Sequence, residues 1–302
     1  MTRIGVDFGG SKIEAAALDP HGAFLARRRI VNPGGYDTAL AATASLISDV
    51  EREAGGEGTI GVGAPGSVSP VSGVIRNANS TWLNGRRFGE DLQAALGRPV
   101  RLANDANCLA LSEAADGAAR GARVAFAVIL GTGCGGGLAI DGKLVDGASG
   151  IAGEWGHTPL PWADAGETPG PRCWCGQSSC LETWISGRGL ERDHAHVSGK
   201  TLSAEQIIAG ARLDDAAAAA SFERYLGRLG RALAMISNIL DPDVFVFGGG
   251  LSNVREIYER LPERIAPFVF ADRWLGRLAA ARWGDASGVR GAARLWDADQ
   301  AR

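Results

Sequence analysis

Two matched strand pairs, each with a glycine-rich tip, constrain the fold more than any other feature of the sequence. The tips are residues 9–12 and residues 131–137, and each carries a small hydroxyl, Ser11 in the first and Thr132 in the second. The apolar strands that flank the tips are residues 4–8 and 13–18 in the first pair and residues 124–130 and 138–140 in the second. A design repeated about one domain apart predicts two related lobes.

Length and composition fit a two-lobed globular protein. The chain has 302 residues, enough for two lobes of roughly 100 to 200 residues each. Charged residues make up 22% of it and the formal net charge is −3, so we expect neither a nucleic-acid nor a membrane partner. The first residues lack the pattern of a signal peptide, and no apolar run is long enough to span a bilayer. We therefore expect a cytoplasmic protein whose five cysteines form no disulfide set.

The glycine-rich turns predict a site for a polyphosphate. Without a Cβ, backbone N–H groups in such turns can approach phosphate oxygens closely. The residues that we expect to hold the phosphates are Gly9, Gly10, Ser11, Lys12, Gly131, Thr132, Gly133, Gly135, Gly248 and Gly249. Asp7 ends the first strand, and a carboxylate facing phosphates there predicts a hydrated Mg²⁺ between them. Lys12 is alternatively a surface residue.

Asp105 is the candidate general base. The apolar residues 100–103 predict a strand, and an alanine-rich helix is predicted to begin directly after it. A carboxylate at this junction can accept a proton from a substrate hydroxyl while nearby backbone N–H groups hold its orientation. The alternative is that Asp105 only caps the helix, because aspartate is a favoured N-cap residue.

Three cysteines within eight residues predict a metal site. Cys173, Cys175 and Cys180 offer three thiolates, and an imidazole would complete a closed tetrahedral zinc site. His157 is the nearest histidine upstream, while His194 and His196 are the alternative fourth ligands. Because protein would fill all four positions, the zinc is expected to be structural and to hold together a loop rich in Pro and Gly.

Two further carboxylates lie close to the predicted metal ligands. Glu154 is three residues before His157, and Glu182 is two residues after Cys180. Carboxylates fixed in this way suit a polyhydroxylated substrate, because each hydroxyl can donate a directed hydrogen bond. Both residues are alternatively ordinary surface acids.

Taken together, these residues resemble the ROK family of sugar kinases (repressor, open reading frame, kinase), within the actin-like ATPase superfamily. The motifs that carry the resemblance span nearly the whole chain: DFGGSK at residues 7–12, NDAN at 104–107, GTGCGGG at 131–137, EWGH at 154–157, and the cysteine cluster followed by Glu182. One departure is Ser179, where the family usually has glycine; it affects the local turn and removes no ligand.

The resemblance implies a two-lobed actin-like ATPase fold, a duplicated ribonuclease H-like α/β design, with a structural zinc loop. The N-terminal lobe would be residues 1–117, completed by a C-terminal helix at residues 287–302, and the C-terminal lobe residues 118–286 would hold the adenosine. ATP, Mg²⁺ and the sugar would meet in the cleft between lobes, with Asp105 as general base. The residues expected to hold the sugar are Asn79, Asn104, Asp105, Glu154, His157 and Glu182.

The finer resemblance is to bacterial fructokinases and mannokinases, through NANSTWLNG at residues 77–85 and LDPDVFVFGGGLSN at residues 240–253. It implies an ATP:hexose 6-phosphotransferase that prefers D-fructose. Alternatives within the family are a glucokinase or mannokinase, an N-acetylglucosamine kinase, or a sugar-sensing regulator. Because dimers are common in the family, we expect a homodimer.

Overall fold

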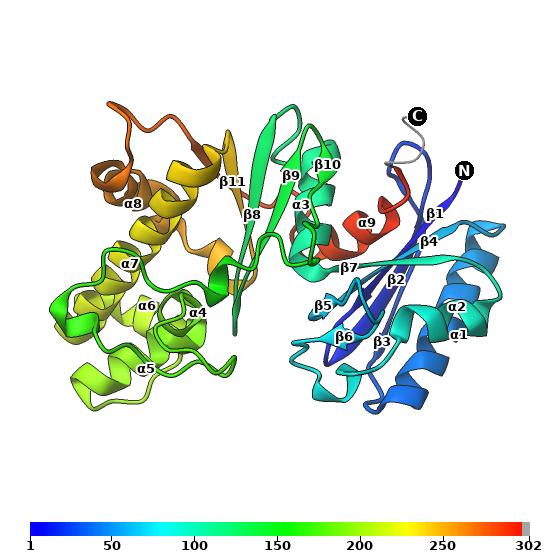
Figure 1. Cartoon of the computed structure of the whole chain (residues 1–302), viewed down its shortest axis with the longest axis horizontal. Helices are drawn as coiled ribbons and strands as arrows, with labels where there is room; N and C mark the ends of the chain where they lie inside the picture. Colours follow the sequence, from blue (N-terminus) through cyan, green and yellow to red (C-terminus); the bar gives the residue numbers. More distant parts are fainter. Residues whose placement is uncertain (298–302) are drawn as a thin grey trace. The chain divides into compact units, whose positions relative to one another are not determined.

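The structure, a computed structural model, describes residues 1–297 and contains two compact units (Figure 1). Among the described residues, one unit comprises Met1–Gly121, Gly137–Ala152 and residues 282–297; the other comprises Ala122–Gly136 and Gly153–Ala281. The sequence predicts residues 137–152 in the C-terminal lobe, whereas in the structure they group with the first unit. The end of the predicted helix at residues 287–302 lies outside the described residues; its described part is α9, Ser287–Ala293.

The first unit is built on a five-stranded sheet. Its strands, in spatial order, are β3 (Phe24–Val31), β2 (Lys12–Leu18), β1 (Arg3–Phe8), β4 (Thr59–Ala64) and β7 (Val100–Asn104). The glycine tip joins β1 to β2 as an antiparallel pair, and β1, β4 and β7 run parallel. The carboxyl ends of the three parallel strands therefore share one edge of the sheet.

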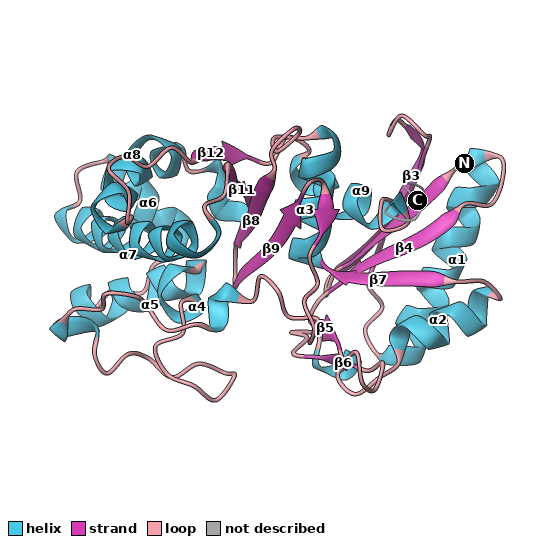
Figure 2. Ribbon diagram, turned by 45° about the horizontal axis from the view of Figure 1, so that its top comes forward, coloured by secondary structure: helices cyan, strands magenta, loops and turns pink. Residues whose placement is uncertain are grey.

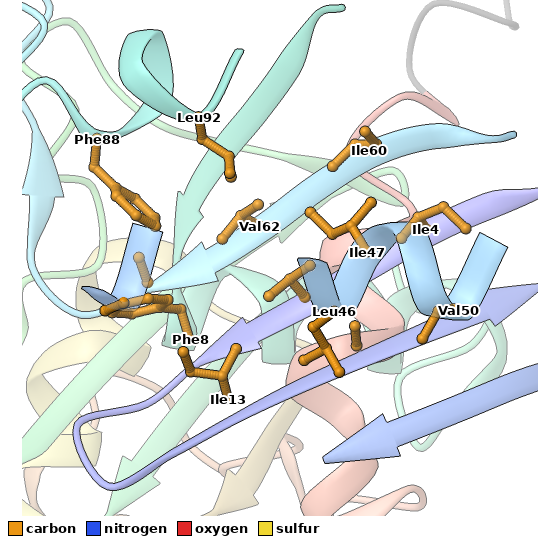
Figure 3. Packing of buried hydrophobic residues seen from close by; sticks show 14 of the residues in the cluster. Ile4, Phe8, Ile13, Leu46, Ile47, Val50, Ile60, Val62, Phe88 and Leu92 are labelled. Atoms are coloured by element: carbon orange, nitrogen blue, oxygen red, sulfur yellow. The ribbon is translucent and has the colours of Figure 1, made fainter. Parts of the chain in front are cut away.

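One face of this sheet packs against α1 (Tyr36–Ala54) and α2 (Phe88–Leu96). Alternate residues of each strand point to this face, as Figure 3 shows for Ile4, Phe8, Ile60 and Val62. Helix α1 contributes Leu46, Ile47 and Val50, and α2 contributes Phe88 and Leu92. The period of two in the strands and of three to four in the helices thus produces one continuous core.

The opposite face packs against the last described helix, α9, with α3 (Asp105–Asp116) beside it (Figure 1). Two strand glycines make this close approach possible. A Cβ on Gly5 would lie 1.9 Å from the carbonyl oxygen of Val289, and one on Gly61 would lie 1.9 Å from that of Ala292. No other residue would fit at these two positions without moving the helix.

The second sheet repeats the order of the first. Its strands are β10 (Lys143–Leu144), β9 (Cys134–Ile140), β8 (Val124–Leu130), β11 (Val244–Gly248) and β12 (Arg277–Ala280). As in the first sheet, the outer pair β10 and β9 is antiparallel, and β8, β11 and β12 run parallel. This repeated topology agrees with two related halves.

Four helices of the second unit gather around the long helix α7 (Ala216–Leu240), as Figure 2 shows. They are α4 (Glu182–Ile185), α5 (Gly187–Ser198), α6 (Ala204–Arg212) and α8 (Arg255–Ile265). Within residues 1–297, no helix has the combination of length and apolar character that crossing a bilayer requires.

Two small elements complete the first unit: the strand pair β5 (Ser67–Val68) and β6 (Ile75–Arg76), which precedes Asn79. Two predicted boundaries are wrong. The second glycine tip ends at Gly133, because β9 begins at Cys134. The last helix, predicted over residues 287–302, ends at Ala293.

A fully buried carboxylate, that of Glu113 in α3, connects the C-terminal segment to the rest of the first unit. Its Oε1 accepts hydrogen bonds from Ser287 Oγ at 2.9 Å and Trp283 N at 3.3 Å. Its Oε2 accepts from Ala118 N at 2.7 Å and Arg282 N at 2.9 Å. Four donors thus replace the water that burial removes, and they hold the start of α9 in place.

We predict that Glu113→Ala lowers the free energy of unfolding by about 3 to 5 kcal/mol, because it leaves several buried donors without an acceptor. Urea denaturation measures the change. Glu53→Ala is the matched control: Glu53 is exposed and pairs with Arg28 at 2.9 Å, so its loss should cost less than about 1 kcal/mol. Equal effects of the two substitutions would contradict the role of Glu113.

Candidate active site

Strand pairing brings the candidate site residues Asp7, Asn104 and Asp105 to one edge of the first sheet, whose strands Figure 2 shows. Asp7 is opposite Gly63 in the β1–β4 register, and Asn104 is opposite Ala64 in the β4–β7 register. Asp7 and the Asn104–Asp105 junction therefore sit at the carboxyl ends of neighbouring parallel strands. In open α/β sheets this edge is where ligands bind.

Asp105 is the first residue of α3, and its neighbour Asn104 is the N-cap. The Oδ1 atom of Asn104 accepts a hydrogen bond from Asn107 N at 2.9 Å. The alternative that Asp105 serves only as the cap is therefore wrong. Asp105 Oδ1 accepts from Ala106 N at 2.8 Å, which fixes the direction of the carboxylate. The group remains accessible to solvent, although the surrounding protein removes enough water to raise its pKa.

Asp7 is half-buried, and its surroundings disfavour the ionised form of its carboxylate. Loss of water raises its pKa to about 6, and the negative charges of Asp105 and Glu14 act in the same direction. Glu14 is its cross-strand partner in the β1–β2 pair. A carboxylate in this position gains from any cation that binds beside it. This donor set fits a hydrated Mg²⁺, since Mg²⁺ prefers oxygen ligands and keeps its water.

Asn32 holds the first glycine tip in place with two hydrogen bonds. The backbone N–H of Asn32 donates to Ser11 O at 2.9 Å, and the side-chain amide of Asn32 donates to Gly9 O at 2.8 Å. Gly9 N also donates to Lys12 O at 2.9 Å, which closes the turn. Gly10 and Ser11 are exposed at its end, and Lys12 is half-buried. The tip has the order that an anion-binding turn requires.

Asn79 lies on an exposed loop that Asn84 holds in shape. The side chain of Asn84 accepts from Ala78 N at 2.9 Å and donates to Ala78 O at 3.1 Å, so it clamps the residue next to Asn79. The buried Ser80 approaches the first tip, since a Cβ on Gly10 would lie 3.1 Å from Ser80 Oγ. The loop and the phosphate tip are therefore neighbours within the first unit.

In the second unit, the tip Gly131–Gly133 follows β8, and Gly248 ends the adjacent parallel strand β11. Gly248 is opposite Ile129 in the β8–β11 register. Gly249 has φ +80°, and a Cβ there would lie 2.4 Å from Leu130 O. The carbonyl of Gly131 accepts from Gly187 N, at the start of α5, at 2.8 Å. Thr132 is exposed at the end of the tip.

Gly135 differs from its predicted position. It lies inside β9 and not in the tip, and its carbonyl accepts a hydrogen bond from Trp155 Nε1 at 3.0 Å. The glycines that follow it serve close packing: a Cβ on Gly136 would lie 2.6 Å from Gly153 O. The glycine run at residues 131–137 predicts a turn throughout, because glycine is common in turns and rare in strands.

The structure brings four predicted metal ligands together. The ligand atoms of His157, Cys173, Cys175 and Cys180 all lie within 4.8 Å of one another. His157 Nδ1 is 3.7 Å from Cys173 Sγ, and the sulfurs of Cys175 and Cys180 are 3.6 Å apart. Zn–S bonds of about 2.3 Å place the ligands of a tetrahedral site about 3.8 Å apart, so the four residues fit a zinc ion.

The alternative histidines lie elsewhere. His194 is buried in α5, where its Nδ1 is 3.0 Å from Ser221 Oγ, and His196 is an exposed residue of the same helix. Neither belongs to the cysteine cluster. Ser179, the departure from the family pattern, has φ +63° beside the last cysteine, a left-handed conformation that glycine would adopt more easily.

The two glutamates near the metal ligands are close to the second tip. Glu182 Oε2 accepts from Cys134 N at 3.0 Å, directly after the tip. Burial raises the pKa of the Cys134 thiol, and the charges of Glu182 and Glu154 raise it further. Glu154 is half-buried and precedes the short 3-10 turn Trp155–His157.

The sequence did not predict the side-chain hydrogen bonds of Asn32, Asn84 and Trp174. Each of these bonds forms only once the loops have folded.

For the metal site, we predict about one zinc per purified chain, as a Cys₃His site requires. His157→Ala should lose the zinc, because three thiolates remain without their fourth ligand. Elemental analysis of the purified variants measures this. His196→Ala is the matched control and should retain zinc. Zinc retained by His157→Ala and lost from His196→Ala would show that the fourth ligand is wrongly assigned.

For Asp7, we predict that Asp7→Asn stabilises the unliganded protein at neutral pH. The folded-state pKa is about 6 against an ordinary 3.8, so the carboxylate costs stability once pH exceeds about 4, and the cost is complete above pH 6. We expect a gain on the order of 1 to 3 kcal/mol at pH 7.5 that vanishes near pH 4. Thermal unfolding without Mg²⁺ at both values measures it; an equal gain at both would contradict the titration.

Comparison with known proteins agrees with this geometry. The profile of the ROK family matches residues 3–299. An N-acetyl-D-glucosamine kinase of Pectobacterium atrosepticum is 41% identical over 297 residues, covering 96% of this chain and 97% of the relative.

Two solved structures share the fold. The ROK hexokinase of Thermus thermophilus has a TM-score of 0.86 at 33% identity, with 97% of each chain covered. A ROK-family glucokinase of Streptomyces griseus, solved with glucose and AMPPNP, has a TM-score of 0.78 at 28% identity, covering 98% of this chain and 99% of that one. The predicted two-lobed actin-like fold is thereby confirmed.

The expected preference for fructose finds no support in these relatives, whereas the N-acetylglucosamine kinase alternative does. Within the segments behind the fructose prediction, Asn84 clamps its own loop, and Phe245 and Phe247 are core residues of β11. From the profile match and the relatives together, this chain belongs to the ROK family, among its sugar kinases.

Proposed function

We propose that this sugar kinase transfers the γ-phosphoryl group of ATP to the 6-hydroxyl of N-acetyl-D-glucosamine. The observation that carries the reaction is the carboxylate of Asp105, accessible at the β7–α3 junction and oriented by Ala106 N–H. The choice of sugar is supported by the kinase of Pectobacterium atrosepticum that is 41% identical across the chain. The choice of donor is supported by the glucokinase solved with an ATP analogue.

The chemistry needs one base. A sugar hydroxyl is too weak an acid to ionise at neutral pH, so its proton leaves as the oxygen approaches phosphorus. Asp105 accepts that proton. The O6–P bond forms while the bond from the γ-phosphorus to the bridging oxygen breaks, and ADP departs with the electron pair. A group that takes a proton during transfer needs only an ordinary or moderately raised carboxylate pKa.

The phosphates would lie against the glycine tips. Backbone N–H groups of residues 9–12 and Gly131–Gly133 would donate to phosphate oxygens, and α5, which begins beside Gly131, would add the positive end of its dipole. Mg²⁺ held through water by Asp7 would neutralise charge on the phosphates. Its binding would also relieve the unfavourable proximity of Asp7 and Asp105.

Each polar side chain predicted to bind the sugar would use a group that can pair with a hydroxyl. Asn104 uses Oδ1 to cap α3, so its amide nitrogen is the group that can donate to a hydroxyl. His157 turns Nδ1 toward Cys173, which leaves Nε2 as the ring nitrogen for the sugar. Glu154, Glu182 and the exposed Asn79 complete the proposed set.

ADP release with a panel of sugars tests the substrate. The panel contains N-acetylglucosamine, N-acetylgalactosamine, N-acetylmannosamine, glucose, mannose and fructose, each with MgATP. We expect kcat/KM for N-acetylglucosamine to exceed those for glucose and fructose by about tenfold or more, because a site that pairs with the amide loses those contacts without it. A higher value for fructose would overturn the substrate, and no ADP release with any sugar would overturn the activity.

We predict that Asp105→Asn retains the fold and changes KM for the sugar little, while kcat falls by about 10² to 10⁴-fold. The amide has nearly the same shape but cannot accept the proton. Steady-state kinetics with N-acetylglucosamine gives both constants, and circular dichroism checks the fold. Turnover near that of the wild type would remove Asp105 from the role of base.

A further inference from the structure

An exposed tryptophan in the metal loop, Trp174, makes an unexpected polar contact. Its indole Nε1 donates a 2.6 Å hydrogen bond to Glu182 Oε1. The ring is 61% exposed, yet it lies edge-on to the imidazole of His157, with ring centroids 5.0 Å apart. Trp174 also lies between two metal ligands in the sequence, Cys173 and Cys175. Its position is therefore determined by the metal loop at one end and by Glu182 at the other.

Glu182 connects Trp174 to the second glycine tip. Its other oxygen, Oε2, accepts from Cys134 N at 3.0 Å. The two carboxylate oxygens thus have different donors, one from the metal loop and one from the backbone beside the tip. Charge-assisted bonds of this kind are stronger and more directional than neutral ones. Rotation of the carboxylate would lengthen both hydrogen bonds.

The carboxylate of Glu182 lies directly against the tip. A Cβ on Gly133 would lie 2.7 Å from Glu182 Oε2, so the carboxylate occupies the space that a side chain would fill. Gly131 N donates to Gly133 O at 3.0 Å, and Gly187 N donates to Gly131 O at 2.8 Å. The shape of the tip therefore depends on contacts from both ends of the short helix α4, which begins at Glu182 and ends at Ile185.

We propose that Trp174 is a positioning residue for nucleotide binding. By fixing the carboxylate of Glu182, it holds Cys134 N and thus the tip Gly131–Gly133 in the form that receives the phosphates of ATP, and it joins the zinc loop to that tip. The assignment of phosphates to this tip rests on the proposed function. The hydrogen-bond path from Trp174 through Glu182 to Cys134 does not.

The test is Trp174→Phe, which retains an aromatic ring beside His157 and removes only the indole N–H donor. Hydrogen exchange of the unliganded protein is followed for a peptide that covers Cys134, and calorimetry gives the Kd for MgAMPPNP. Loss of one charge-assisted bond should speed the exchange of the Cys134 amide and weaken nucleotide binding by about fivefold each. In kinetics, KM for ATP should rise more than kcat falls.

The matched control is Trp162→Phe. Trp162 is a half-exposed tryptophan of the same unit whose ring packs on Phe268 at 5.1 Å, so its exchange and affinity values should equal those of the wild type. Zinc content is measured in both variants and should be unchanged. If Trp174→Phe loses zinc, the residue acts by retaining the metal and the proposal is overturned.

A double-mutant cycle with Glu182→Gln completes the test. If Trp174 acts through Glu182, adding Trp174→Phe to Glu182→Gln should change the exchange of the Cys134 amide little further. Additive effects would overturn the proposal, as would unchanged exchange in Trp174→Phe alone. Hydrogen exchange is measured without any ligand, so these outcomes do not depend on the sugar panel. If the wild-type protein is inactive toward all sugars, that result counts against the proposed function alone.

Discussion

The first sheet holds two carboxylates, those of Asp7 and Asp105, near each other at the ends of parallel strands. Like charges at such an edge oppose the folded state, and the pKa of Asp7, raised to about 6, is a direct sign of that cost. The arrangement is stable because the rest of the unit compensates, chiefly through the apolar core between the sheet and α1 and through the close packing of α9 on Gly5 and Gly61. Because the two carboxylates repel each other, a cation that binds at this edge would relieve part of the cost.

The second sheet uses the same strand order for a different task. Its parallel strands β8 and β11 end at or directly before glycines without a carboxylate equivalent to Asp7, because Ile129 and Leu130 end β8 where Asp7 and Phe8 end β1. Charge enters instead from outside the sheet, through Glu154 and Glu182 next to the Cys₃His cluster. A repeated topology thus supplies two turns of similar form, and the segments inserted around them supply different chemistry.

Local patterns predicted much of the fold and the residue types of the candidate site. Val124–Leu130 has the predicted bounds, because it is a short apolar run ended by a turn residue. The start of β9 was not predictable, since Gly136 serves close packing against Gly153, which lies far along the chain. The same reason applies to Glu113, whose partners Arg282 and Ser287 lie 169 and 174 residues away. Long-range contacts of this kind have no local signature.

The first unit is discontinuous, and this has a consequence for how the protein is made. One face of its sheet is covered by α9, which leaves the ribosome only after residues 1–286 have been synthesised. Until then the glycine-lined face of β1 and β4 and the carboxylate of Glu113 lack their partners, whereas most of the second unit has already emerged. The segment that begins the sequence is thus among the last to reach its native packing.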